Sequence, residues 1–120
     1  MRGAAVARSS RYDAIDFTPT KGAAQAASRG LTLRQAHGRG GTTVGVARAR
    51  DLAARNALSP TTIRRVTSYF ARHQVDKRGE GWADRKHPSA GYIAWRLWGG
   101  DAGRRWAERI EQRMHKVEER

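Results

Sequence analysis

Apolar side chains recur along this chain at intervals of three and four residues, the spacing that marks one face of an α-helix. No stretch alternates apolar and polar side chains with a period of two, the pattern of a half-buried strand. The pattern therefore predicts an all-α fold: a compact single domain of four to five short helices that follows an extended N-terminal arm.

The arm is predicted to cover residues 1–19, and the helical domain residues 20–120. Small residues dominate the arm, so it is either disordered or held on the core by its three sizeable apolar side chains. These are Tyr12, Ile15 and Phe17. The first predicted helix begins at Thr20 and is rich in alanine and leucine, although Gly22 and Gly30 weaken its middle.

Hydroxyl residues then mark the starts of the second and third helices. Thr42 or Thr43 caps a helix that reaches about Arg55, and Ser59-Pro60 opens one that reaches about Gln74. The second helix has a narrow apolar face made by Val46, Ala49, Leu52 and Ala53. The third buries Ile63, Val66, Tyr69 and Phe70 and exposes Arg64, Arg65 and Arg72.

The C-terminal half begins with a polar loop over residues 75–89, which Trp82 pins to the core. Pro88-Ser89 opens a fourth helix that is apolar on every side and therefore belongs inside the core. Gly99-Gly100 ends it, and Asp101 is placed to cap the last helix. The buried stripe of that last helix is Trp106, Ile110, Met114 and Val117.

The charge of the chain indicates what kind of partner it binds. The formal net charge is +13, and twenty of the 24 basic residues are arginine. A surface with this much positive charge favours a polyanionic partner, most commonly nucleic acid. Codon bias in a high-GC genome is an alternative explanation for the high proportion of arginine. No acidic residue occurs between Phe17 and Arg50, whereas residues 81–120 mix nine basic with six acidic side chains. The acid-free segment is where a polyanion is expected to bind.

Several classes of function lack their chemistry here. The chain has no cysteine, so disulfides and thiolate metal sites are excluded, in keeping with a reducing cytoplasm or an assembled particle. The four histidines lack metal-ligand spacing, and no acid, base and nucleophile converge on a catalytic pattern. No apolar run approaches the ~20 residues that cross a bilayer, and no signal peptide is apparent. We therefore expect no enzymatic activity, cofactor, metal or membrane partner.

One segment resembles the helix-turn-helix of lac-repressor-type regulators. It runs from Asp51-Leu52-Ala53 to Leu58-Ser59-Pro60-Thr61-Thr62-Ile63-Arg64-Arg65-Val66. The resemblance implies that Thr61, Thr62 and Arg65 face the major groove or the adjacent phosphates. The segment departs from the family pattern in two places. Arg55 occupies a position at which these regulators bury an apolar side chain, and Asn56-Ala57 replaces the Ala-Gly of their turn.

The glycine-rich run at residues 38–45 allows two interpretations. Its backbone N–H groups could hold a phosphate before the following helix, with Arg39 favouring an anion there. It could equally be a flexible loop between helices. No Gly-Lys-Ser/Thr follows and no strand precedes it, so it is not a P-loop.

Three further blocks resemble a small, poorly characterised domain family of tailed phages and prophages. They are Ile15-Asp16-Phe17-Thr18-Pro19 with Arg29-Gly30-Leu31, Gly38-Arg39-Gly40-Gly41-Thr42 with the run from Val44 to Leu52, and Ser68-Tyr69-Phe70-Ala71-Arg72-His73 with the blocks 75–77, 79–82, 88–95 and 97–101, Gly103 and Trp106. The likeness covers roughly residues 12–107. It implies a phage setting, in the host cytoplasm or the virion, with either DNA handling or a structural place.

The leading hypothesis is a non-enzymatic domain that binds nucleic acid, DNA in preference to RNA, through arginine–phosphate contacts. The residues expected to bind are Arg39, Arg48, Arg50, Thr61, Thr62, Arg64, Arg65 and Arg72. One alternative is a virion or assembly protein that docks on an acidic phage structural protein, which an exposed apolar arm would favour. A helix-turn-helix transcription regulator, which requires a dimer and an operator, is the third. The oligomeric state is left open.

Overall fold

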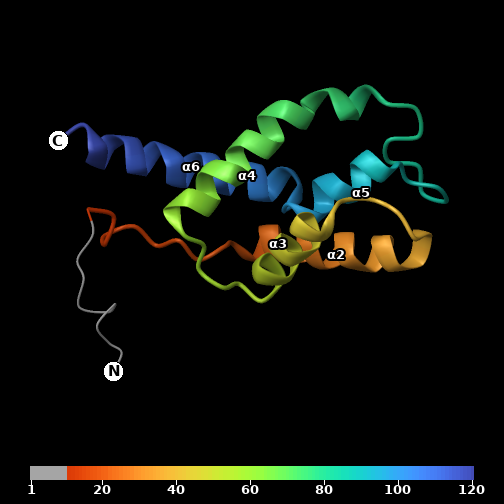
Figure 1. The fold of residues 1–120 in the computed structure, drawn as a ribbon, viewed down its shortest axis with the longest axis horizontal. Helices are drawn as coiled ribbons and strands as arrows, with labels where there is room; N and C mark the ends of the chain where they lie inside the picture. The colour runs from red at the N-terminus through yellow and green to blue at the C-terminus, as the bar shows by residue number, and fades with distance from the viewer. Residues whose placement is uncertain (1–10) are drawn as a thin grey trace.

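The computed structural model describes residues 11–120, and in this part of the chain every regular element is helical. The elements are α2 (Lys21–His37), α3 (Thr43–Ala53), α4 (Pro60–His73), the short 3₁₀ helix η1 (Gln74–Arg78), α5 (Ala90–Leu97) and α6 (Gly100–Glu118). The predicted all-α fold is confirmed. Figure 1 shows α4 crossing α6 on one side of the molecule, with α2 and α3 on the other.

Four of the helices begin where a hydroxyl side chain accepts a hydrogen bond from a backbone N–H of the first turn. The capping residues are Thr20, Thr42, Ser59 and Ser89, and their oxygens lie 3.0–3.3 Å from the capped nitrogens. Each cap satisfies a donor that the helix itself leaves unpaired. Because this signal is local, the starts predicted from the sequence are confirmed for α2 to α5.

The expected cap of the last helix is wrong. α6 begins at Gly100 after Gly99, whose φ of 116° lies in the left-handed region, and no side chain caps it. Two glycines with positive φ let the chain turn directly from α5 into α6. Asp101 therefore lies inside the first turn, where it accepts hydrogen bonds from Lys77 and from the indole N–H of Trp95.

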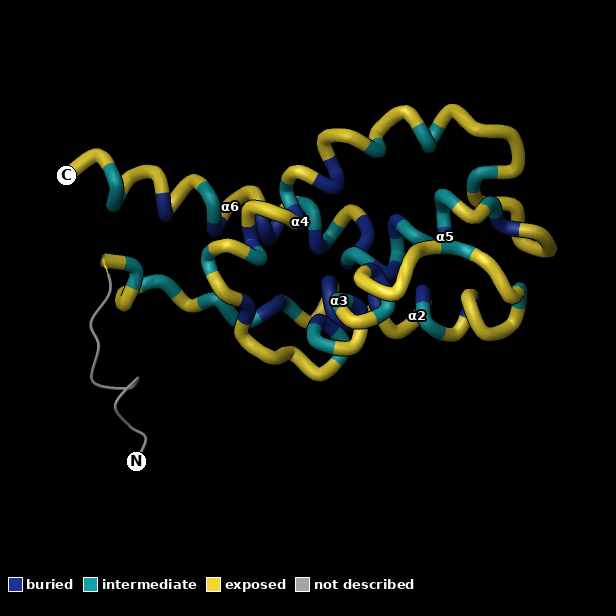
Figure 2. Tube along the Cα trace, in the orientation of Figure 1, coloured by how far each residue is buried: buried dark blue, intermediate teal, exposed yellow. Residues whose placement is uncertain are grey.

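The core lies where the five α-helices α2 to α6 meet. Its largest fully buried side chains include Phe70, Leu52, Ile63, Ile93, Leu97, Met114 and Val66. Figure 2 shows buried positions interrupting exposed ones along α6, as an amphipathic helix requires. α5 contacts α2, α3, α4, α6 and η1, so the prediction that it belongs inside the core is confirmed.

Gly30 is needed where α2 crosses α5. A Cβ at this position would lie 2.6 Å from the backbone nitrogen of Leu97, so no side chain fits between the two backbones. The glycine lowers the helix propensity of α2 but permits a closer approach of the two helices.

The described part of the arm, residues 11–19, lies on the domain. Tyr12, Ile15 and Phe17 are partly buried against the core, and the carbonyl of Phe17 accepts a hydrogen bond from the N–H of Leu58. Of the two interpretations of the arm, the one that lays it over the core holds for these residues. Residues 1–10 lie outside the described residues.

The predicted loop at residues 75–89 holds one helical element at its start, the 3₁₀ helix η1. The ring of Trp82 meets those of Tyr92 and Trp95 edge to face, at centroid distances of 5.3 and 5.8 Å. These contacts confirm that Trp82 fixes the loop to the core.

Candidate nucleic-acid interface

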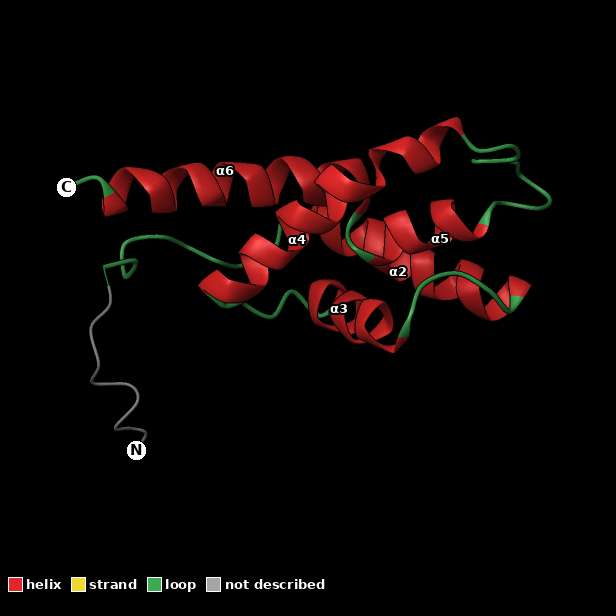
Figure 3. Ribbon diagram, turned by 45° about the horizontal axis from the view of Figure 1, so that its top comes forward, coloured by secondary structure: helices red, strands yellow, loops and turns green. Residues whose placement is uncertain are grey.

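A groove of about 700 Å³ lies between the N-terminal turn of α3, the outer face of α4 and the end of α5. Its lining is Gly41, Thr42, Val44, Thr61, Arg64, Arg65, Ser68, Tyr69, Arg72, His73, Asp76, Ala94 and Trp98. Four residues expected to bind nucleic acid, Thr61, Arg64, Arg65 and Arg72, are thus brought together. Figure 3 shows α3 and α4 as separate helices, with α4 above α3.

The wall that α4 contributes is a polar stripe at helical spacing. Thr61, Arg65, Ser68 and Arg72 follow one another at intervals of four, three and four residues, so they share one face of the helix. The apolar residues of α4 hold the opposite side in the core, which turns this stripe toward the groove. Arg72 donates a hydrogen bond of 2.6 Å to the hydroxyl of Ser68, and Arg65 has no hydrogen-bond or ion-pair partner among residues 11–120.

Arg64 also lines the groove, but its guanidinium is already engaged. It donates to a carboxylate oxygen of Glu118 at 2.9 Å and to the hydroxyl of Tyr12 at 3.1 Å. The Tyr12 hydroxyl in turn donates to the same carboxylate oxygen. The hydrogen bond from Tyr12, together with Arg64, holds the pKa of Glu118 below its ordinary value. Arg64 therefore joins the arm, α4 and the end of α6.

Stacked aromatic rings form the floor of the groove. The ring of Tyr69 lies between those of His73 and Trp98, at centroid distances of 4.4 and 4.6 Å, and the Arg48 guanidinium carbon lies 5.7 Å from the centre of the Trp98 ring. The hydroxyl of Tyr69 is buried without a hydrogen-bond partner. Burial, and then the charge of Asp76, raise the pKa of this hydroxyl, so it stays protonated.

An unpartnered buried hydroxyl costs about 1–3 kcal/mol, so folded cores seldom retain one. Tyr69 is 5% exposed, and its ring lines the groove. The lining therefore combines exposed guanidinium groups with an apolar floor that keeps one unsatisfied polar group.

Four expected binding residues lie outside the groove lining. Arg39 donates to the carbonyl of Pro88 at 2.8 and 3.3 Å and so fastens its loop to the start of α5. The Arg48 side chain is only 13% exposed and lies 3.7 Å from Asp51, so little of it is open to a ligand. Arg50 is exposed in the last turn of α3. Thr62 accepts from the hydroxyl of Ser59 at the cap of α4.

The glycine-rich loop has a packing explanation. A Cβ at Gly40 would lie 2.6 Å from the Ile93 side chain, and one at Gly41 would lie 2.5 Å from that of Leu97. Both residues also have positive φ. Close contact with α5, rather than a phosphate cradle, accounts for the glycines at these two positions.

The helices α3 and α4 do not form a helix-turn-helix. Six residues link them, Arg55 among them with a left-handed φ of 56°, and no Cα atoms of the two helices lie within 8 Å of each other. In a helix-turn-helix the second helix is held directly on the first by a short turn. The local resemblance of residues 51–66 therefore does not extend to the arrangement of the helices.

Most of the basic side chains of residues 11–120 have no ion-pair partner within that part of the chain. Among residues 11–120, the lysines and arginines within 4 Å of a carboxylate oxygen are Arg48, Arg64, Lys77 and Arg104. The helices α2, α3 and α4 together contain one acidic residue, Asp51. Asp76 also lines the groove, where it lies 3.1 Å from the ring of His73. The positive charge near the groove is thus largely uncompensated.

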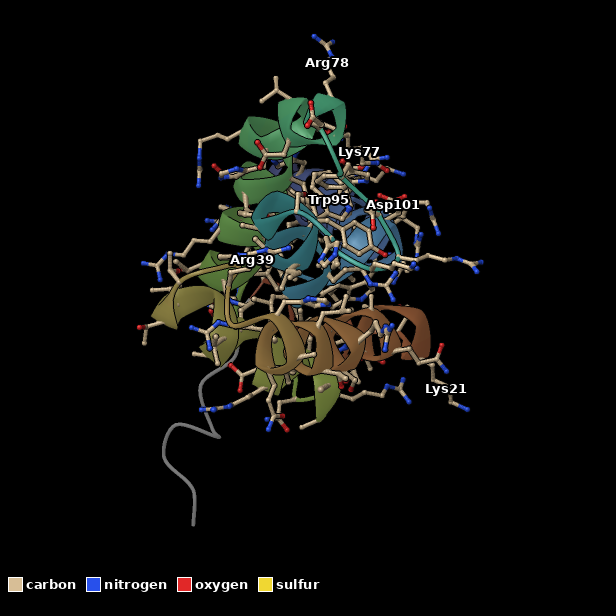
Figure 4. The ribbon with its side chains drawn as sticks, turned by 90° about the vertical axis from the view of Figure 1, so that its right-hand side faces the viewer. Lys21, Arg39, Lys77, Arg78, Trp95 and Asp101 are labelled. Carbon is tan, nitrogen blue, oxygen red and sulfur yellow. The ribbon has the colours of Figure 1, made fainter. Side chains whose placement is uncertain are left out.

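A second cavity, of about 330 Å³, contains the cluster Lys77, Trp95 and Asp101, whose polar groups satisfy one another, while the buried Nε of Arg96 in the same lining has no hydrogen-bond partner. Lys77 lies 3.0 Å from Asp101 and 4.6 Å from the centre of the Trp95 ring, and Trp95 donates to the same carboxylate. Figure 4 shows Lys77, Trp95 and Asp101 gathered together, while Arg78 and Lys21 extend away from the body. Partial burial raises the pKa of Asp101, but the hydrogen bonds from Lys77 and Trp95 outweigh it and lower that pKa overall. This cluster needs no ligand to satisfy it.

Within residues 11–120, no helix is both long and apolar enough to span a bilayer. The same residues hold no group of three or more histidine, aspartate or glutamate side chains that could bind a metal ion.

No protein-family model, no curated protein and no solved structure matches this chain.

The groove residues that sequence reasoning did not assign to binding include Ser68, Val44 and Trp98. Ser68 lies between Arg65 and Arg72 on the helical wheel of α4, so this signal was present in the sequence. Val44 and Trp98 carried no such signal, because their place in the wall depends on how α3 and α5 pack beside α4.

Proposed function

We propose that this protein is a non-enzymatic nucleic-acid-binding domain that acts through arginine–phosphate contacts, with DNA as the favoured polymer. The observation that carries the proposal is the stripe of α4. Arg65 and Arg72 share one groove-facing side of a helix that contains no acidic residue. Arginine guanidinium groups and the hydroxyl groups of serine and threonine, the side chains of this stripe, commonly donate hydrogen bonds to phosphate oxygens.

Two other features of the surface support an anionic ligand. The N-terminal turn of α3, which forms the other wall, carries backbone N–H groups without intrahelical partners and the positive end of the helix dipole. The acidic residue of the lining, Asp76, is paired with the ring of His73. Binding of this kind depends steeply on salt and little on sequence.

The docking alternative lacks the feature that would favour it. Tyr12, Ile15 and Phe17 pack on the core and do not offer an exposed apolar arm to a capsid or portal protein. We therefore propose the nucleic-acid function alone.

The test measures the affinity for fluorescent DNA, both as a single strand and as a duplex, by anisotropy over a series of salt concentrations. We compare Arg65→Gln/Arg72→Gln with a control of equal charge, Arg105→Gln/Arg109→Gln, whose arginines are exposed on α6 outside the groove lining. Each lost phosphate contact lowers the slope of log K against log salt by about one, so the groove variant should lose about two. The proposal fails if the wild-type protein does not bind at low salt, or if both variants bind alike.

A further inference from the structure

Resting on this proposed function, we infer that the groove between α3 and α4 holds an unpaired strand of nucleic acid and so favours single strands over duplexes. The shape of the groove fits one strand. The arginine stripe of α4 is one wall of a hollow, and Thr42 and Val44 of the α3 end stand across from it. A helix that enters the major groove of a duplex must instead project freely.

The size of the groove also fits a short length of single-stranded nucleic acid. A volume of about 700 Å³ lies in the range of sites that enclose a small molecule, about one or two nucleotides. Arg65 and Arg72 are two turns apart, which places their Cα atoms about 10 Å from one another along α4. That interval spans about three nucleotides of one strand at duplex rise. The stripe can therefore follow a short length of a single backbone.

The apolar part of the lining supplies a contact that a duplex cannot use. Val44 is 56% exposed, and Val75 is the other large apolar side chain of the described residues with such exposure. Val44 faces the groove together with Ala94 and Trp98, whereas Val75 does not line it. The faces of the bases in a duplex are covered by their neighbours, but an unpaired base offers its face to apolar and aromatic side chains.

The polar groups of the groove lining can bind the phosphates of the same strand. Phosphates would lie along Arg65, Ser68 and Arg72, and the first turn of α3 would add backbone donors from the opposite wall. Tyr69 belongs to the same lining, and an unpaired base keeps donors and acceptors on its edge that the hydroxyl and guanidinium groups of the stripe could meet. Contacts of this kind tolerate many sequences.

The experiment compares two probes by anisotropy at one salt concentration: a labelled 15-nucleotide DNA strand of mixed sequence and the same strand annealed to its complement. The wild-type protein should bind the single strand more tightly. Val44→Ala should lower the affinity for the single strand by about fivefold, because the contact with the base shrinks, and should leave the salt slope unchanged. The matched control is Val75→Ala, which removes an equally exposed valine outside the groove and should have no effect. Thermal unfolding of each variant confirms that it folds.

The possible results separate this inference from the function on which it rests. If the duplex binds as tightly as the strand, or if the two valine variants bind alike, the groove does not hold an unpaired base. Salt-dependent binding that Arg65→Gln/Arg72→Gln weakens would then still support the proposed function. If poly-glutamate displaces the strand at equal charge concentration, an acidic protein is the better occupant and the inference is overturned.

Discussion

The helices α4 and α6 pack on each other, and both bury an apolar stripe, yet their outer faces differ. α6 mixes signs: it carries five basic and four acidic residues, and Arg104 lies 3.6 Å from Glu108 one turn further on. The outer face of α4 has arginine and hydroxyl side chains and no carboxylate. The outer face of α6 is an ordinary solvated surface, whereas that of α4 concentrates one sign of charge.

The difference bears on why the chain is so rich in arginine. Codon bias can replace lysine by arginine throughout a protein, but it does not remove carboxylates from one helix and keep them on its neighbour. Pairs of opposite charge one turn apart stabilise a helix by about 0.2–0.5 kcal/mol, and α4 contains no such pair. The acid-free face is therefore better explained by an external anion than by the stability of the helix.

The largest effect we expect comes from the inner face of α4. Phe70 is fully buried, so Phe70→Ala should lower the free energy of unfolding by about 3–5 kcal/mol through lost burial and a cavity. Arg65→Gln on the outer face should change it by less than about 0.5 kcal/mol. Urea unfolding of both variants measures the contrast. Similar losses in the two variants would mean that the groove face also holds the fold, and the comparison with α6 would fail.

A smaller effect should follow when α4 is given the charge pattern of α6. Ser68→Glu places a carboxylate between Arg65 and Arg72, and we expect about tenfold weaker binding of nucleic acid, or about 1.4 kcal/mol. The helix itself should not be destabilised, because the new charge lies one turn from two arginines. Anisotropy with the labelled strand measures the affinity.

The matched control for this variant lies on α6. Gln112→Glu makes the same charge change at an exposed position that also has basic residues three positions before it and four after it, Arg109 and Lys116. It should reduce affinity only through the net charge of the protein. Equal losses from the two substitutions would show that the face of α4 has no special role in binding.

Features encoded within a few residues of one another could be predicted from the sequence. The caps at Thr20, Ser59 and Ser89 are hydroxyl groups three residues before the nitrogens that they satisfy, so the helix starts follow without tertiary structure. The exposed arginines of α4 follow equally from the position of its apolar face. Asp101 failed as a cap because the two preceding glycines start α6 earlier and Lys77, 24 residues away, binds its carboxylate.

The groove itself could not be predicted, because it is made by the packing of three helices. Nothing near Val44 in the sequence indicates that it faces α4, and nothing near Arg48 indicates that its guanidinium covers the Trp98 ring. Gly30 is a similar case. The sequence shows that this glycine lowers the helix propensity of α2, but only the structure shows that the close crossing of α2 and α5 requires a residue without a side chain there.

The smallest effect concerns the junction at which α4, α6 and the arm meet. The hydrogen bond from Tyr12 lowers the pKa of Glu118 most, and Arg64 adds to it. A carboxylate whose pKa falls on folding stabilises the protein above its ordinary value of 4.5, and this contribution is lost as the pH falls through the lower folded value. Glu118→Gln should therefore melt slightly below the wild-type protein at pH 7, and the two melting temperatures should converge as the pH is lowered below 4.5. The neighbouring Glu119→Gln, at an exposed position with no hydrogen bond from Tyr12 or Arg64, serves as the control and should follow the wild-type protein throughout. A difference between Glu118→Gln and wild type that stays constant with pH would mean that the junction does not depend on the charge of Glu118, and that α4 and α6 are joined there by packing alone.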